Sequence, residues 1–259
     1  MKWGFERVIV RVVICIFMIG AGAIFALIIL SKHPGVKQPA DISSRPMREV
    51  RINQIFAPDN LSLPKQSLAH LISMIETNQP VVFLTMDDGQ YKDDRAIEFL
   101  KSRQWPVTLF LADIYAKENY VYFKNLVQSG ATVQNHTLSH HYLKDLNYKQ
   151  QKNEICVASD KVQEVFGMHP NLLRPPGGHY DSNTYGAAYE CGVKTIVMWS
   201  AKVDGGIVQY QKGDRLVPGD IVLMHFRPKI MEDLAAFEAE IIKQNLYVAR
   251  LEDWIRISN

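Results

Sequence analysis

The chain has 259 residues, of which 47% are hydrophobic and 22% are charged, as is usual for a folded globular protein with a sizeable core. The formal net charge is +2, and most of the positive excess lies within the first 37 residues. The remainder is close to neutral, which excludes a nucleic-acid-binding protein, because that function needs a basic face or stripe.

The N-terminus contains a candidate membrane anchor. Residues 12–30 form an uncharged apolar run, which as a helix rising about 1.5 Å per residue would cross a bilayer. Lys2, Arg7 and Arg11 precede the run, and basic residues favour the cytoplasmic side. We expect a single-pass anchor in the cell membrane with the rest of the chain on the extracytoplasmic side. A cleaved signal peptide is the alternative, because residues 21–23 read Ala-Gly-Ala.

This pattern divides the chain into three parts. Residues 1–30 are the cytoplasmic tip and the transmembrane anchor. Residues 31–52 are polar, contain three prolines and show no periodicity, so they are expected to be a linker. Residues 53–259 are expected to form the folded domain.

Strand-like and helix-like segments alternate along this domain. Alternation over so long a stretch predicts a parallel α/β sheet or barrel, in which functional side chains gather where strands end. In chain order we expect a helix at 64–77, a strand at 81–86, a helix at 94–103, a strand at 107–112, a helix at 120–128, a strand at 131–134, a helix at 146–166, a strand at 172–173, a helix at 182–191, strands at 194–199 and 221–225, a helix at 233–244 and a strand at 247–250.

Two adjacent carboxylates, Asp87 and Asp88, follow the strand at 81–86, and Gly89 permits a sharp turn after them. Neighbouring side chains on an extended chain diverge, so one carboxylate can bind a metal ion while the other accepts a proton. A solvated turn is the alternative interpretation of this sequence on its own.

Two histidines four positions apart, His136 and His140, follow the strand at 131–134. On a helical turn both rings would share one face, which suits two imidazoles on one metal ion. A pair of surface histidines is the alternative. His141 would point away from that face, and we expect no ligand role for it.

An arginine and a histidine end two further strands. Arg174 is followed by Pro175 and Pro176, which stiffen the backbone, and an arginine there can hold a carboxylate. His225 ends the apolar strand at 221–225, on the expected sheet edge. A surface arginine and a packed histidine are the alternatives.

Together these segments resemble the NodB-type polysaccharide deacetylases, a carbohydrate esterase family. The resemblance extends from about residue 81 to residue 254 and implies a distorted, incomplete (β/α) barrel for the catalytic domain. The four segments that carry it, in chain order, are Thr85-Met86-Asp87-Asp88-Gly89, His136-Thr137-Leu138-Ser139-His140, Arg174-Pro175-Pro176-Gly177-Gly178 and Leu223-Met224-His225.

The resemblance also implies a role for each residue. Asp87 is the general base, Arg174 orients it, and His225 is the general acid. Leu223 lines the acetyl pocket. From the reaction chemistry itself, we expect a backbone N–H near Gly177 to stabilise the oxyanion together with the metal. The ligands implied for a divalent metal ion, commonly zinc, are Asp88, His136 and His140.

One further motif departs from the family. The family typically has Trp-Ser-Val-Asp-x-x-Asp-Trp, where this chain has Trp-Ser-Ala-Lys-Val-Asp-Gly-Gly. Lys202 therefore stands in place of the first aspartate, and Gly205 and Gly206 replace the final Asp-Trp. We expect Asp204 to take over part of the task of fixing Arg174, in a more open substrate pocket.

Aromatic residues near these motifs are candidates for contact with sugar rings. Tyr180 and Trp199 could stack on the substrate, and Tyr91 could lie at the rim of the cleft. Packing in the hydrophobic core is the alternative for each of them.

The cysteines show no metal-binding spacing. Cys15 lies within the apolar run. We expect Cys156 and Cys191 to be buried free thiols, with a disulfide between them as the alternative.

The sequence thus predicts a metal-dependent enzyme that hydrolyses N-acetyl groups of an extracytoplasmic polysaccharide. Peptidoglycan is the leading substrate, because an enzyme tethered outside a membrane meets it first. Other N-acetylglucosamine polymers are alternative substrates. The alternatives are an esterase for O-acetylated polysaccharides and a glycan-binding protein without activity.

Overall fold

The computed structural model describes residues 68–255. The apolar run at 12–30, the linker and Cys15 lie outside this range, so their predictions stay untested. Within the described residues no helix has the length and apolar character needed to cross a bilayer.

Within residues 68–255, ten strands form one sheet in the order β1-β6-β5-β4-β3-β2-β9-β7-β8, and β10 pairs with the start of β2. All strand pairings are parallel except that of β7 with β8. The strands are β1 His70–Ile72, β2 Val81–Asp88, β3 Thr108–Leu111, β4 Thr132–Asn135, β5 Leu172–Leu173, β6 Thr195–Val197, β7 Ala201–Asp204, β8 Ile207–Tyr210, β9 Ile221–His225 and β10 Tyr247–Val248.

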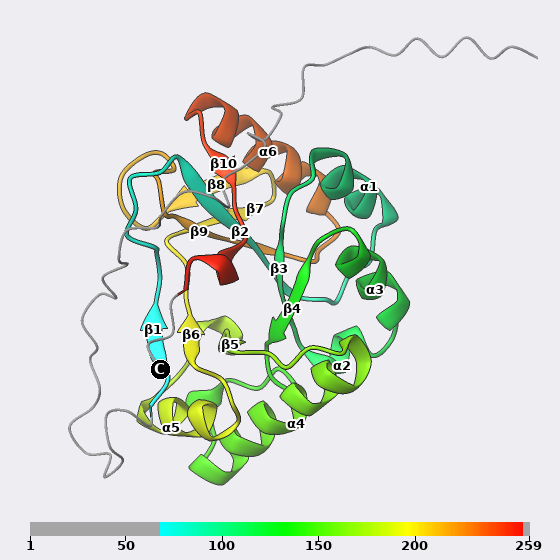
Figure 1. Cartoon of the computed structure of the whole chain (residues 1–259), viewed down its shortest axis with the longest axis vertical. Coiled ribbons are helices and arrows are strands. Elements are labelled where there is room, and N and C mark those ends of the chain that lie inside the picture. Colours follow the sequence, from blue (N-terminus) through cyan, green and yellow to red (C-terminus); the bar gives the residue numbers. More distant parts are fainter. Residues whose placement is uncertain (1–67, 256–259) are drawn as a thin grey trace, which may run out of the picture. The chain divides into compact units, whose positions relative to one another are not determined.

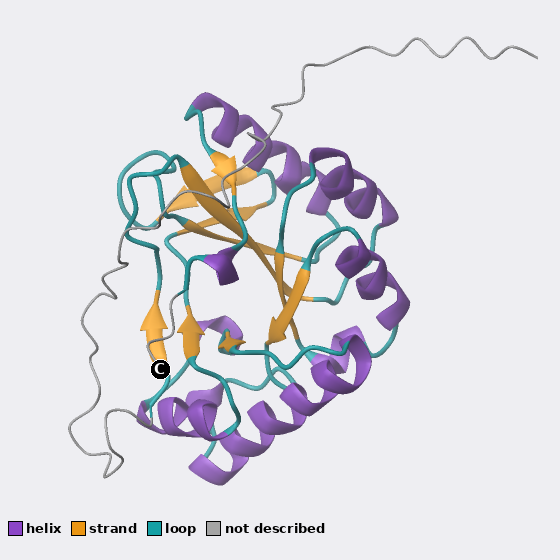
Figure 2. Ribbon diagram, viewed as in Figure 1, coloured by secondary structure: helices purple, strands orange, loops and turns teal. Residues whose placement is uncertain are grey.

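Helices connect most of the parallel strands and lie around the outside of the sheet (Figure 2). This arrangement is the one that parallel strands require, since each crossover must return the chain to the same end of the sheet. The helices are α1 Asp94–Arg103, α2 Asp113–Ala116, α3 Tyr120–Gln128, α4 Tyr148–Phe166, α5 Ser182–Glu190 and α6 Ile230–Lys243, with short 3₁₀ segments η2 Leu143–Asp145, η3 Pro176–Gly178 and η4 Leu251–Asp253.

The sheet is curled but does not close, because its two edge strands, β1 and β8, are not paired with each other. Apolar side chains fill its inner face, where the rings of Phe83 and Trp254 lie 5.7 Å apart. The segment η4, red in Figure 1, lies in the middle of the curled sheet. The expected distorted, incomplete (β/α) barrel is therefore confirmed.

Local sequence signals account for the helix that later supports the site, α4. Asn147 and Gln150 form a reciprocal capping box at its start. Gly167 ends it in the left-handed conformation, with φ 72°, which glycine adopts without steric cost.

The structure differs from the sequence prediction in two places. The described part of the expected helix at 64–77 contains the strand β1, which pairs with β6. Its apolar spacing also fits an edge strand whose partner lies more than a hundred residues away. In addition, Gly205 and Gly206 form the turn of the hairpin β7–β8, where both have positive φ values of 65° and 79°.

The cysteine prediction is wrong. Cys156 on α4 and Cys191 at the end of α5 form a disulfide, with their Cα atoms 4.8 Å apart. The two residues are 35 positions apart in the sequence. Only the packing of α4 against α5 brings them together, and no local pattern reports that packing.

Candidate active site

The two adjacent carboxylates lie at the end of β2 and are both buried. Asp87 continues the strand in register with His225 on β9. Asp88 has a positive φ of 75°, so its side chain does not follow the regular alternation of side chains along the strand. The expected divergence of the two carboxylates therefore arises from the backbone at Asp88.

His136 and His140 converge on Asp88. Their Nε2 atoms lie 3.3 Å and 3.0 Å from Asp88 Oδ1, respectively. One ligand atom from each of the three residues lies within 4.8 Å of the others, which is compatible with a single bound cation. The two rings meet through positive φ values at Thr137 and His140, 72° and 61°, and not through the helical turn that the spacing suggested.

The other nitrogen of His136 fixes the orientation of its ring. His136 Nδ1 lies 2.6 Å from the carbonyl oxygen of Arg174, so Nε2 is directed at Asp88. A histidine that ligates a metal commonly makes a hydrogen bond of this kind through its second nitrogen.

The charges in the cluster are coupled. Burial alone would raise the pKa of Asp88, but the hydrogen bonds to His136 and His140 hold that pKa below its usual range. Burial favours the neutral imidazole of His136, but Asp87 and Asp88 raise its pKa above the ordinary value. The site therefore attracts positive charge, whether as protons or as a cation.

Arg174 holds Asp87 from the interior of the barrel. Its guanidinium is fully buried, and Nη1 donates to Asp87 Oδ1 at 2.8 Å and to Thr85 Oγ1 at 2.7 Å. Nε and Nη2 donate to the carbonyl oxygens of Val197 and Met198. Four hydrogen bonds thus hold the arginine in place. Thr85 is a supporting residue that the sequence analysis missed.

His225 and Leu223 lie on β9, beside the carboxylates. Register pairs Leu223 with Thr85 and His225 with Asp87, so both side chains face the site. Burial lowers the pKa of His225, while Asp87 and Asp88 oppose that shift. The structure brings His225 to the expected sheet edge.

The histidine loop is held by α4. Glu154 Oε2 accepts from the Ser139 backbone N–H at 2.9 Å, and Oε1 accepts from the Ser139 hydroxyl at 2.6 Å. Asn135, fully buried, donates to the Ile155 carbonyl and to Ser159 Oγ. The sequence analysis missed Asn135 and Glu154, although two polar residues at buried positions were a possible signal.

Gly177 follows Arg174 by three residues and lies in the segment η3. Gly177 has φ 61°, and a Cβ at this position would lie 2.9 Å from the Tyr142 ring. Tyr142 is exposed, and its ring centroid lies 4.3 Å from that of His179. The segment therefore places an exposed glycine beside an exposed aromatic ring.

The three aromatic residues proposed to contact sugar rings are half-buried, and each packs on one side against the core. Tyr180 lies against Tyr185 with ring centroids 5.8 Å apart, and Trp199 packs against the core inside the barrel. Tyr91 packs against the core between the sheet and its helices.

Asp204 does not fix Arg174. It lies at the end of β7 and pairs with Arg227 Nη1 at 3.3 Å. The hydrogen bonds of the Arg174 side chain go to Thr85, Asp87, Val197 and Met198 instead. The expected role of Asp204 is therefore corrected.

The assembled donors fit a divalent metal ion. One carboxylate and two imidazoles form a ligand set typical of catalytic zinc sites, which keep positions open for water and substrate. Asp87 and His225 adjoin this set without belonging to it. His141 lies outside the set, and its Nδ1 lies 2.6 Å from Ser139 Oγ.

The chain is similar to known proteins. A family model described as polysaccharide deacetylase matches residues 75–196. The chain is 39% identical over 194 residues to an uncharacterised protein of Streptomyces coelicolor, a match covering 73% of this chain and 78% of that protein. It is 25% identical over 201 residues to a peptidoglycan-N-acetylglucosamine deacetylase of Bacillus cereus, covering 70% of this chain and 91% of that protein.

A solved structure supports the fold. A protein of Bacillus anthracis described as a CE4 family pseudoenzyme superposes with a TM-score of 0.60 and 21% identity, covering 71% of this chain and 68% of that chain. The match to the family model and the likeness to the Streptomyces coelicolor protein together show that the chain belongs to the polysaccharide deacetylase family.

Proposed function

We propose that the chain is a metal-dependent deacetylase that removes N-acetyl groups from an extracytoplasmic polysaccharide, with peptidoglycan as the leading substrate. The observation that carries the proposal is the cluster of Asp88, His136 and His140, whose ligand atoms lie within 4.8 Å of one another. The likeness to the peptidoglycan deacetylase of Bacillus cereus supports the choice of substrate.

The reaction needs a nucleophile, a base and an acid. A divalent metal ion held by Asp88, His136 and His140, with zinc the leading candidate, would lower the pKa of the attacking water and polarise the amide carbonyl. Asp87 is fixed by Arg174 at 2.8 Å and accepts the proton of that water.

The remaining residues act on the tetrahedral species and the leaving group. A backbone N–H in the Gly177 segment stabilises the developing oxyanion. His225, on the strand next to Asp87, donates a proton to the sugar nitrogen as the C–N bond breaks. The products are acetate and a sugar with a free amine.

We also propose that the domain works outside the cytoplasm, anchored by residues 12–30. The disulfide between Cys156 and Cys191 supports this location, because disulfides persist mainly in oxidising compartments. Cell fractionation tests the proposal, since an anchored chain stays in the membrane pellet after a salt wash and a soluble one does not.

A glycan-binding protein without activity is the second candidate, since a CE4 family protein of the same fold is described as a pseudoenzyme. Against this candidate, the six side chains expected to bind the metal or act in catalysis are present and contact one another or lie in register.

The deciding experiment measures acetate release from N-acetylated and O-acetylated oligosaccharides, with and without a chelator. Chelator-sensitive release from the N-acetylated substrate supports the proposal, and release from the O-acetylated substrate alone supports an esterase. If neither substrate yields acetate after the metal is restored, the chain has no deacetylase activity on these glycans.

A further inference from the structure

Lys202 lies on the face of the sheet that carries the active site. On β7 it pairs in register with Leu223 of β9, which in turn pairs with Thr85 of β2. Residues paired in register project to the same face of a sheet, and Thr85 faces the site. Lys202 has Ala201 and Val203 as its sequence neighbours. Both project to the other face of the sheet and pack in the core between the sheet and its helices.

The position is close to the reacting groups. Lys202 is one strand away from Leu223, and Leu223 precedes His225 by two residues. With strands about 4.8 Å apart and a rise of about 3.3 Å per residue, the Cα atoms of Lys202 and His225 lie roughly 8 Å apart. A lysine side chain covers most of such a distance, so the Lys202 ammonium can reach a substituent next to the scissile acetamide.

The charge of Lys202 has no counterion within residues 68–255. Its side chain is half-buried and forms no hydrogen bond or ion pair with the described residues. The carboxylate on the same face of β7, Asp204, is paired with Arg227 at 3.3 Å. The register partner on β8 is Gln209, which is uncharged.

We propose that Lys202 binds a carboxylate on the glycan beside the N-acetyl group, so that the enzyme prefers an acidic N-acetylated polymer to a neutral one. An ammonium group binds a carboxylate through a charge-assisted hydrogen bond, which gains strength where water is partly excluded. This inference rests on the proposed function, because Lys202 would act at the same site. In a cell-wall glycan the carboxylate comes from a lactyl ether on the sugar or from an attached peptide.

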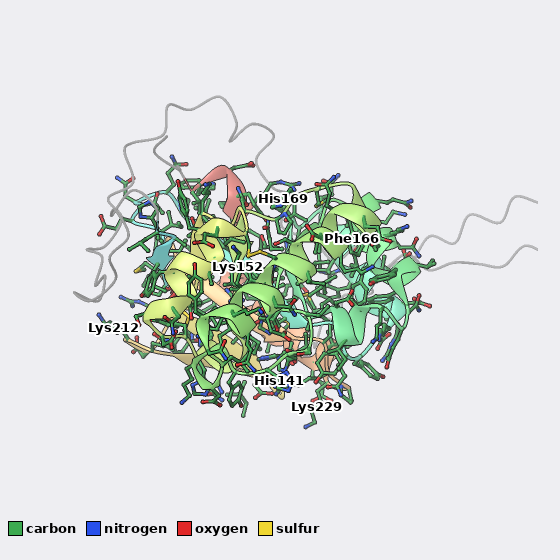
Figure 3. The ribbon with its side chains drawn as sticks, turned by 90° about the horizontal axis from the view of Figure 1, so that it is seen from below. His141, Lys152, Phe166, His169, Lys212 and Lys229 are labelled. Atoms are coloured by element: carbon green, nitrogen blue, oxygen red, sulfur yellow. A yellow bond between two sulfur atoms is a disulfide. The ribbon has the colours of Figure 1, made fainter. Side chains whose placement is uncertain are left out.

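The test compares three variants of the full, metal-loaded protein. Lys202→Met removes the charge and Lys202→Arg keeps it. Lys212→Met is the matched control, because Lys212 is exposed, lies just after β8 and points outward at the edge of the molecule in Figure 3. Unchanged melting temperatures establish that each variant is folded.

Acetate release is measured on a neutral N-acetylglucosamine oligomer, on peptide-free cell-wall glycan with lactyl carboxylates, and on the same glycan with its peptides. We expect Lys202→Met to lower kcat/KM on an acidic substrate by roughly tenfold, mainly through KM, because one hydrogen bond to a charged group is lost. Activity on the neutral oligomer stays unchanged, Lys202→Arg retains most activity, and the affected substrate identifies the source of the carboxylate.

An equal loss on neutral and acidic substrates, or no loss on any, would overturn the role of Lys202 and leave the proposed function intact. If the wild type releases no acetate from any substrate, the proposed function fails. Calorimetric binding of the peptide-free glycan to the wild type and Lys202→Met then decides the inference separately, since weaker binding by the variant supports it and equal binding refutes it.

Discussion

Asp87 and Asp88 are consecutive residues with different neighbours. Asp87 accepts from Arg174 at 2.8 Å, whereas Asp88 lies 3.0 Å from His140 Nε2. The backbone of Asp88, with φ 75°, separates the two side chains. A proton acceptor and a metal ligand can therefore occupy adjacent positions.

Replacing each carboxylate in turn separates these roles. Asp87→Asn should lower kcat by roughly 10²–10⁴-fold while the metal content stays normal, because only the proton acceptor is lost. Asp88→Asn should lose both the metal and the activity. Metal analysis of the purified variants checks this, and a metal-free Asp87→Asn would show that Asp87 is a ligand and not the base.

Thr85 supports the arginine that holds Asp87. Its hydroxyl accepts from Arg174 at 2.7 Å and donates to the Val222 carbonyl at 2.8 Å. Thr85→Val should cost about 1–3 kcal/mol of stability, because buried partners lose their hydrogen bonds, and should lower kcat more than it changes KM. Thr85→Ser keeps the hydroxyl and should restore both, and a Val variant with normal kcat would remove Thr85 from the mechanism.

At the scale of elements, α4 positions the proposed metal ligands without supplying one. Glu154 holds the Ser139 backbone at 2.9 Å, one residue before His140. Glu154→Ala should weaken metal affinity by roughly 10–100-fold, as loss of a supporting hydrogen bond does in other metal sites. Glu164→Ala, on an exposed turn of the same helix, is the control, and equal metal affinity in both variants would refute this role.

The sequence predicted the elements that begin or end with strong local signals. The strand at Ile221–His225 and the helix at Asp94–Arg103 have the predicted bounds. The hairpin β7–β8 was missed, although Gly205-Gly206 between two short runs is a turn signal.

The parts of the site that could not be predicted depend on contacts between distant segments. The proposed ligands and the proposed base were predictable because each lies at or shortly after the end of a strand of a parallel sheet, and such ends share one edge. Glu154 and Thr85 act on residues 15 and 89 positions away, respectively, through packing that no local pattern reports.

At the scale of the whole domain, the disulfide joins α4 to the end of α5. Closing a loop of 35 residues stabilises the fold by about 3–4 kcal/mol in the chain-entropy model. Thermal unfolding with and without a reductant checks this, and Cys156→Ser with Cys191→Ser should match the reduced protein. An unchanged melting temperature on reduction would show that helix packing alone holds this region.

The central claim is that one cation held by Asp88, His136 and His140 drives hydrolysis of an N-acetyl group. The most direct measurement adds zinc back to chelated protein and follows acetate release from peptidoglycan glycan strands, with mass spectrometry of the products. The account predicts no release from the metal-free protein and a rise that levels off near about one ion per chain. Full activity of the metal-free protein, or of Asp88→Asn, would contradict it.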